Sequence, residues 1–146
     1  MEFFQYLSLV RFKGLIPLLK NYSNKNVSII LDLEDSAQDL FSRKRTENLK
    51  RICQKGLIHI ARKKINVKNK IFIRINKVDT KVFDEDIKAI KASVRYGLKI
   101  EGIFVPKIDN FSQLNKVYNI LKKNCSIKLV PIIETKRGLK NLESII

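Results

Sequence analysis

The sequence predicts an α/β fold in which short buried strands alternate with longer amphipathic helices. Two observations lead to this prediction. Strongly apolar runs recur every few tens of residues, and stretches with helical spacing separate them. The runs are apolar along nearly their whole length instead of at alternate positions, which is typical of strands in a parallel sheet buried on both faces. A single α/β domain is therefore expected.

Five segments are predicted to form the strands of this sheet. Four of them combine β-branched and other apolar residues with few interruptions, and the N-terminal one is weaker. The strong segments are residues 27–34, 71–75, 102–106 and 128–133, and the weaker segment is residues 4–10.

The first predicted helix covers residues 49–60. Its apolar residues recur at helical spacing, so they are expected to share one face, while Lys50, Arg51 and Lys55 face solvent. The expected buried face consists of Leu49, Ile52, Cys53, Gly56, Leu57 and Ile60.

Three further helices follow later in the chain. One carries Ile87, Ile90, Ala92 and Val94 and is expected to end at Gly97 as a C-terminal cap. The next follows residues 109–112, which are rich in capping side chains. A last helix is expected to begin near Arg137. The apolar positions of the middle helix are Leu114, Val117, Tyr118 and Leu121.

The formal net charge of +16 raises the question of a polyanion partner. The basic residues are spread along the chain, with only small groups at residues 43–45 and 62–64. Aromatic residues are not interleaved with them, as a stacking platform for bases would require. A solvated lysine-rich surface is favoured over a nucleic-acid-binding module, which is kept as a third hypothesis.

The cysteines and the histidine give no metal-site pattern. Cys53 and Cys125 are far apart and are expected to be reduced structural thiols, and His59 is expected to pack in the core. Arg11 and Lys13 interrupt the apolar N-terminal stretch, so no leader is predicted. We expect a cytoplasmic protein without membrane contact.

Polar residues with chemical uses follow four of the five predicted strands. Crowded carboxylates need a nearby cation, which an arginine or a divalent metal can supply. Glu134 can give Mg²⁺ an oxygen ligand, and the planar fork of Arg74 suits a substrate carboxylate. The strand-end residues are Asp32, Glu34 and Asp35, then Arg74 and Asn76, then Lys107, and finally Glu134 and Thr135.

The same residues also have purely structural interpretations. Residues 32–35 can be a helix cap and loop, and Arg74 can pair with their carboxylates. Glu134 can be an exposed residue before a helix, and Lys107 an ordinary loop lysine.

Four motifs in order give the chain a family resemblance. They are IILDLEDS at residues 29–36, IRIN at 73–76, IFVPKI at 103–108, and PIIET at 131–135 with Arg137 and Gly138 following. In these motifs the chain resembles the citrate lyase β-subunit family, which includes malyl- and citramalyl-coenzyme A lyases within the HpcH/HpaI aldolase group. The resemblance covers residues 27–146 and corresponds to the N-terminal portion of that family's domain.

The resemblance implies a (β/α)₈ TIM barrel with about five of its eight β/α units present. It also implies a Mg²⁺-dependent carbon–carbon lyase or aldolase acting on a 2-hydroxy or 3-hydroxy acid or its coenzyme A thioester. Arg74 would bind the substrate with Asp32 and act in catalysis with Glu34 and Asp35. Glu134 would bind the metal.

Some family features are not found in this sequence. The family's second metal ligand, an aspartate on the next strand, is not reached by residue 146. Residues 10–12 replace the small-residue turn expected for a coenzyme A thioester. We therefore expect residues 1–146 to form a single truncated barrel domain that assembles as a homo-oligomer. A non-catalytic relative with an interaction or regulatory role is the alternative function.

Overall fold

The fold is built on one parallel sheet. The computed structural model describes residues 3–23, 25–122 and 127–145. Five strands pair in sequence order, each parallel to its neighbour. They are β1 (Phe4–Ser8), β2 (Ser28–Asp32), β3 (Ile71–Arg74), β4 (Gly102–Val105) and β5 (Lys128–Pro131).

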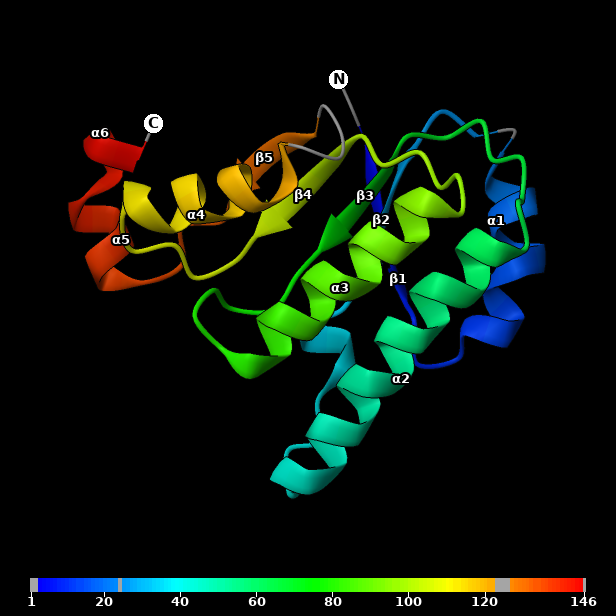
Figure 1. Ribbon diagram of the computed structural model, residues 1–146, viewed down its shortest axis with the longest axis horizontal. Coiled ribbons are helices and arrows are strands. Elements are labelled where there is room, and N and C mark those ends of the chain that lie inside the picture. The colour runs from blue at the N-terminus through cyan, green and yellow to red at the C-terminus, as the bar shows by residue number, and fades with distance from the viewer. Residues whose placement is uncertain (1–2, 24, 123–126, 146) are drawn as a thin grey trace.

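Helices alternate with these strands, as the sequence predicted. Figure 1 shows α2 and α3 lying side by side along the sheet, with α4 beside β4 and β5. This sequential β/α order matches part of a TIM barrel. The helices are α1 (Leu15–Tyr22), α2 (Arg43–Arg62), α3 (Lys81–Arg95), α4 (Phe111–Leu121), α5 (Lys136–Lys140) and α6 (Leu142–Ile145), with short 3₁₀ turns η1 (Phe12–Gly14) and η2 (Asp35–Ala37).

Polar side chains fix where the main helices begin. Each N-cap side chain accepts a hydrogen bond from a backbone N–H in the first turn, and such a cap contributes about 1 kcal/mol. Gly97 follows the C-cap of α3 with φ of +93°, a conformation that glycine adopts without strain. The N-caps of α2, α3, α4 and α5 are Ser42, Thr80, Asn110 and Thr135.

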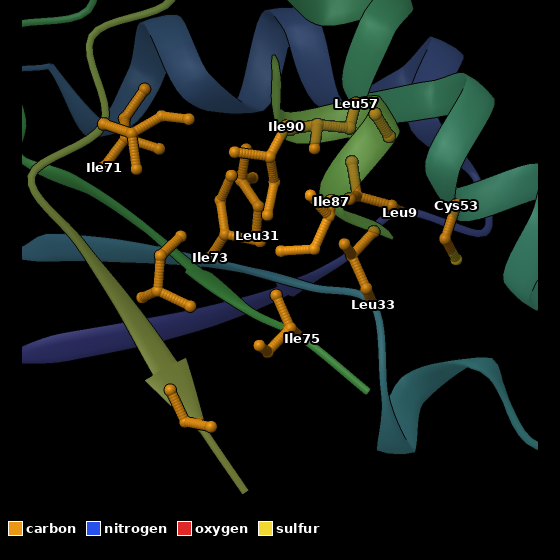
Figure 2. Close-up of a cluster of buried hydrophobic side chains, with 14 of the residues drawn as sticks. Leu9, Leu31, Leu33, Cys53, Leu57, Ile71, Ile73, Ile75, Ile87 and Ile90 are labelled. Carbon is orange, nitrogen blue, oxygen red and sulfur yellow. The ribbon is translucent and has the colours of Figure 1, made fainter. Parts of the chain in front are cut away.

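The main core lies between the sheet and the layer formed by α2 and α3. Figure 2 shows strand side chains such as Leu31 and Ile73 facing helix side chains such as Leu57 and Ile90. All four are fully buried. Because successive strand residues point to opposite faces, alternate residues of β2 and β3 enter this core.

The opposite face of the sheet carries aromatic residues. Phe4, Phe72 and Phe104 pack edge to face, with ring centroids 5.3 to 5.6 Å apart. Phe72 is buried, whereas Phe4 and Tyr6 on the edge strand β1 are 41% and 44% exposed. Such aromatic pairs add to the stability that burial gives.

Several details of α2, which contains the first predicted helix, differ from the sequence prediction. It begins at Arg43, well before Leu49, because Ser42 supplies an N-cap. Ile52 is 38% exposed, whereas Lys50 is half-buried and turns inward. The helix α1 was not predicted at all.

The structure bears on only part of the predictions for the two cysteines and the histidine. Cys53 is a buried thiol, and burial raises its pKa to about 12, so it stays protonated and unreactive. Cys125 lies outside the described residues. His59 is half-buried, with its ring centroid 5.1 Å from that of Phe12.

Candidate functional site

The candidate site lies at the edge of the sheet where the strands end. Asp32 and Arg74 are the last residues of β2 and β3 and stand opposite each other in the strand register. Lys107 lies two residues beyond β4, and Glu134 lies three residues beyond β5. Parallel strands bring their carboxyl ends to one edge, so residues far apart in sequence meet here.

Arg74 is held by three carboxylates. Its Nε and Nη2 donate to the two oxygens of Asp32, at 2.8 and 2.7 Å. Its Nη1 donates to Oδ2 of Asp35 at 2.9 Å and lies 3.7 Å from Oε2 of Glu34. The guanidinium also sits 4.9 Å from the centre of the Tyr6 ring. The hydrogen bonds to Asp32 raise the pKa of Arg74, which is charged at every working pH.

Asp32 anchors the loop that carries the other carboxylates. Besides Arg74, it accepts hydrogen bonds from the backbone N–H groups of Glu34 and Ser36, each at 2.9 Å. Burial raises its pKa, but these hydrogen bonds outweigh burial, so the pKa of Asp32 lies below its ordinary value. Asp32 is therefore an ionised, buried group that shapes the loop and orients Arg74.

Glu34 has an incompletely satisfied carboxylate. The side chain is 3% exposed, and Nζ of Lys107 donates to its Oε1 at 2.5 Å. Its Oε2 is buried and accepts no hydrogen bond within the part of the chain that the structure describes. Burial raises the pKa of Glu34 despite the opposing effect of Lys107. A buried oxygen of this kind can accept a proton or contact a ligand.

Lys107 links two carboxylates from different strand ends. Its ammonium group contacts Glu34, while its backbone N–H donates to Oε1 of Glu134 at 3.1 Å. Its φ of +54° lies in the left-handed region, which is uncommon for a lysine and is found often at functional sites. Nothing in the sequence pointed to this conformation, because Lys107 matched an ordinary loop lysine.

Glu134, like Asp35, is an exposed carboxylate of the site. Among the described residues, no group of three or more His, Cys, Asp or Glu side chains could hold a metal ion. Mg²⁺, however, uses only one or two carboxylates and takes its other ligands from waters and substrate oxygens. Glu134 is an exposed carboxylate at the strand ends and fits that requirement.

A buried polar network supports the site from behind. The backbone N–H and the side-chain amide of Asn76 donate to Oδ2 of Asp86, at 2.7 and 2.9 Å. The amide of Asn76 also donates to the carbonyl of Leu33, and its oxygen accepts from Lys50. Gln54 donates to the second oxygen of Asp86. This network connects α2 and α3 to the loops after β2 and β3.

Asp86 and Lys50 were not among the site residues predicted from the sequence. Asp86 is fully buried on α3, and burial raises its pKa to about 6 against the hydrogen bonds from Asn76 and Gln54. The available signal was a carboxylate on the apolar face of that helix, between Phe83 and Ile87.

Comparison with known proteins places this fold and these strand-end motifs in a family of lyases and aldolases. The chain belongs to the HpcH/HpaI aldolase/citrate lyase family, whose family model matches residues 23–146. The expected resemblance is therefore confirmed. A search of the curated proteins found no match.

Solved structures share the fold. The structure of RipC from Yersinia pestis superposes with a TM-score of 0.64 at 22% sequence identity. The match covers 99% of this chain and 52% of the RipC chain, so the present chain spans about half the length of RipC.

In the described part of the chain, no helix has the length and apolarity needed to cross a membrane.

Proposed function

We propose that this chain contributes to the active site of a Mg²⁺-dependent carbon–carbon lyase. The proposed substrate is a 2-hydroxy or 3-hydroxy acid, free or as its coenzyme A thioester. The observation that carries the proposal is the bridge from Glu34 through Lys107 to Glu134 at the carboxyl ends of the strands. Membership of the lyase and aldolase family supports the reaction type.

Arg74 is proposed to bind the substrate carboxylate by exchanging one partner. Its pair with Asp32 is buried, whereas Asp35 is 52% exposed. A substrate carboxylate can replace Asp35 at Nη1 without disturbing the buried pair. In this proposal Asp32 serves substrate binding by orienting the guanidinium, and Asp35 controls access to it.

Glu34 is proposed to move the proton in the reaction. Cleavage of a 3-hydroxy acid requires a base that takes the hydroxyl proton while the carbon–carbon bond breaks. The bonding electrons then pass to the carbon beside the carboxylate or thioester, and that carbon takes up a proton. The raised pKa of Glu34 and its bare Oε2 suit this exchange, and Lys107 balances the charge when Glu34 is ionised.

Glu134 is proposed to be the metal ligand. Lys107 contacts both Glu134 and Glu34, so the two carboxylates lie around the same residue. Bound Mg²⁺ would supply a Lewis acid for the negative charge that develops on the substrate oxygen. Its remaining ligands would be waters and substrate oxygens.

Magnesium titration of the protein tests this function. We expect Glu134→Gln to weaken Mg²⁺ affinity by on the order of 100-fold or more. Even the substitution of a residue that only hydrogen-bonds to a metal ligand weakens metal affinity about 10–100-fold. The matched control is Glu143→Gln, which removes an exposed carboxylate from α6. Equal affinity in the Glu134 and Glu143 variants would contradict the proposed ligand.

The second candidate is a non-catalytic relative with an interaction or regulatory role. The observation in its favour is that protein carboxylates already occupy the guanidinium of Arg74. If Mg²⁺ binds through Glu134 but substrate acids produce no cleavage and no Arg74-dependent binding, this candidate replaces the lyase.

A further inference from the structure

A lysine-rich groove lies at the end of the sheet opposite the candidate site. Two adjoining cavities of about 740 and 500 Å³ form it, and residues 68–70 line both of them. The loops before β2, β3 and β4 supply most of the remaining lining, at residues 25–28, 64–67 and 96–101. Figure 1 shows these loops at one end of the fold, away from the first turns of α2 and α3. We name this region the lysine groove.

Positive charge dominates the lysine groove. Among the described residues, its lining contains a single carboxylate, that of Glu101. Glu101 already pairs with Lys128, at 2.5 Å. A neighbouring cavity that shares Lys64 adds Lys20 and Lys63 to the same end of the fold. The lysines that line the groove itself are Lys25, Lys64, Lys68, Lys70 and Lys99.

Most of this charge is not neutralised by the protein. Lys25, Lys64, Lys68 and Lys99 are exposed, and none of them forms an ion pair with a carboxylate in the described part of the chain. Like charges that gather without counter-ions repel one another, so a bound polyanion would relieve this repulsion. The active sites of barrel enzymes lie at the opposite, carboxyl ends of the strands, so the proposed lyase reaction does not need these lysines.

Asn69 fixes the shape of the lysine groove. Its side-chain amide donates to the carbonyl oxygens of Tyr22, Lys25 and Val27, at 2.8 to 3.0 Å. The loop before β3 is thereby tied to the loop before β2, so the backbone segments that carry Lys25 and Lys68 are held together. A site that is already ordered loses less entropy when a ligand binds.

Tyr96 adds an aromatic ring to the lining of the groove, and it is 39% exposed. The guanidinium of Arg62 lies 4.9 Å from the centre of this ring and donates to its hydroxyl at 2.9 Å. Bases of single strands stack on aromatic rings and arginine planes, so this pair offers a stacking surface beside the lysines. Basic and aromatic residues that are dispersed along the sequence are therefore neighbours in the fold.

We propose that the lysine groove binds single-stranded nucleic acid. The two adjoining cavities match a chain of phosphates, which the lysines can contact in succession while a base reaches Tyr96. A membrane surface is flat and contacts projecting side chains, whereas these lysines line concave surfaces. The inference goes beyond the proposed lyase function, because it uses none of the residues assigned to that reaction.

Fluorescence anisotropy with a labelled oligouridylate of about 12 nucleotides tests the proposal. The combined variant Lys64→Gln, Lys68→Gln and Lys99→Gln should weaken binding about tenfold or more. The slope of log affinity against log salt concentration should become less steep by about 2, because each lost phosphate contact removes about 0.7. All three lysines are exposed, so the variant is expected to fold.

The matched control combines Lys44→Gln, Lys81→Gln and Lys136→Gln. These lysines are also exposed and lie in the first turns of α2, α3 and α5, at the other end of the fold. The control removes the same charge, so it measures the general attraction of a basic protein for anions. Its affinity should stay within about twofold of that of the unchanged protein.

Tyr96→Leu separates stacking from charge. It removes the exposed ring and leaves every lysine in place, so affinity should fall at least about fivefold while the salt slope stays the same. Unchanged affinity in this variant would exclude a stacked single strand as the ligand.

Equal losses in the two lysine variants, or no saturable binding, would overturn the proposal. Lysine-dependent binding to phosphatidylserine vesicles without binding to the oligonucleotide would also overturn it, in favour of an anionic membrane. A parallel titration with oligothymidylate distinguishes RNA from DNA, and either result supports the groove: tighter binding of oligouridylate indicates contact with the 2′-hydroxyl. Mg²⁺ binding at Glu134 is measured separately, so failure of either proposal leaves the other standing.

Discussion

Arg74 and Asp32 form a bidentate ion pair across adjacent strand ends, with donor–acceptor distances of 2.8 and 2.7 Å. The pair satisfies both oxygens of a carboxylate whose side chain is only 3% exposed. It also places the third guanidinium nitrogen beside Asp35, the exposed acid of the same loop. One arginine thus fixes the loop after β2 and presents the exchangeable contact proposed for substrate.

Breaking this pair should destabilise the fold. Asp32→Ala leaves Arg74 without its buried partner, which costs about 3 kcal/mol or more in the free energy of unfolding. Urea denaturation measures this change. Glu85→Gln is the control, because it breaks an exposed ion pair with Lys88, and its unfolding midpoint should match that of the unchanged protein. A midpoint shift as small in Asp32→Ala as in the control would show that the pair contributes little.

Asp86 should make stability depend on pH. Its pKa is about 6 in the folded state and 3.8 in the unfolded chain, so the folded state binds the proton more tightly. Stability from Asp86 is therefore greatest below the unfolded pKa and falls as pH rises toward and through 6. The difference of about two pKa units corresponds to about 3 kcal/mol.

The measurement compares unfolding free energies of the unchanged protein and Asp86→Asn from about pH 4 to about pH 7. Asparagine does not titrate, so the difference between the two proteins should change across this range. Asp32 and Glu34 titrate in both proteins and cancel. Parallel pH profiles would show that Asp86 keeps an ordinary pKa.

The φ of +54° at Lys107 should be tolerated only because of Glu34. Lys107→Gly relieves the backbone strain, which contributes about 1 kcal/mol, but removes the closer of the two cations beside the buried Glu34 and leaves only Arg74, at 3.7 Å. In the presence of Glu34→Gln, the same change removes strain without that cost. We therefore expect Lys107→Gly to destabilise the unchanged protein and to stabilise the Glu34→Gln variant. A double-mutant cycle by denaturation tests this change of sign.

Much of the fold follows from local signals in the sequence. Continuous apolar runs such as residues 71–74 specify buried strands, and capping residues such as Asn110 specify helix starts. The helix α1 escaped prediction because its apolar residues continue an N-terminal apolar stretch interrupted by Arg11 and Lys13. Ser42 was not predicted as an N-cap because the residues that follow it are basic, whereas the helix was expected to begin at its first apolar residues.

The strand-end positions of the site were predictable, but the contacts among them were not. The sequence indicates that Arg74 and the residue 32–35 carboxylates meet, because both follow neighbouring strands. It cannot show that Arg74 is shared among them. Lys50 was assigned to the solvent face by its charge alone, although its spacing to Gln54 and Leu57 places all three on one side of α2.

Gly138 should resist substitution for a steric reason. A Cβ atom at this position would lie 2.2 Å from the backbone carbonyl oxygen of Ile108, which cannot move independently of its loop. Gly138→Ala should therefore lower the unfolding free energy by about 1 to 3 kcal/mol. Gly14→Ala is the control, because no described atom beyond those of its chain neighbours lies within 4 Å of the place its Cβ would take. Similar melting temperatures for the two variants would mean that the loop after β4 shifts freely.

The aromatic face of the sheet should promote self-association. Phe4 is 41% exposed and continues the cluster formed by Phe72 and Phe104, so it presents apolar surface at the edge strand β1. Exposed apolar patches and unpaired strand edges favour contact between copies. We expect Phe4→Lys to raise the monomer fraction in sedimentation velocity. Phe111→Lys is the control, since Phe111 is 56% exposed on α4 and lies outside this cluster. A monomer fraction that rises equally in both variants would attribute association to general hydrophobicity and not to the face that carries Phe4.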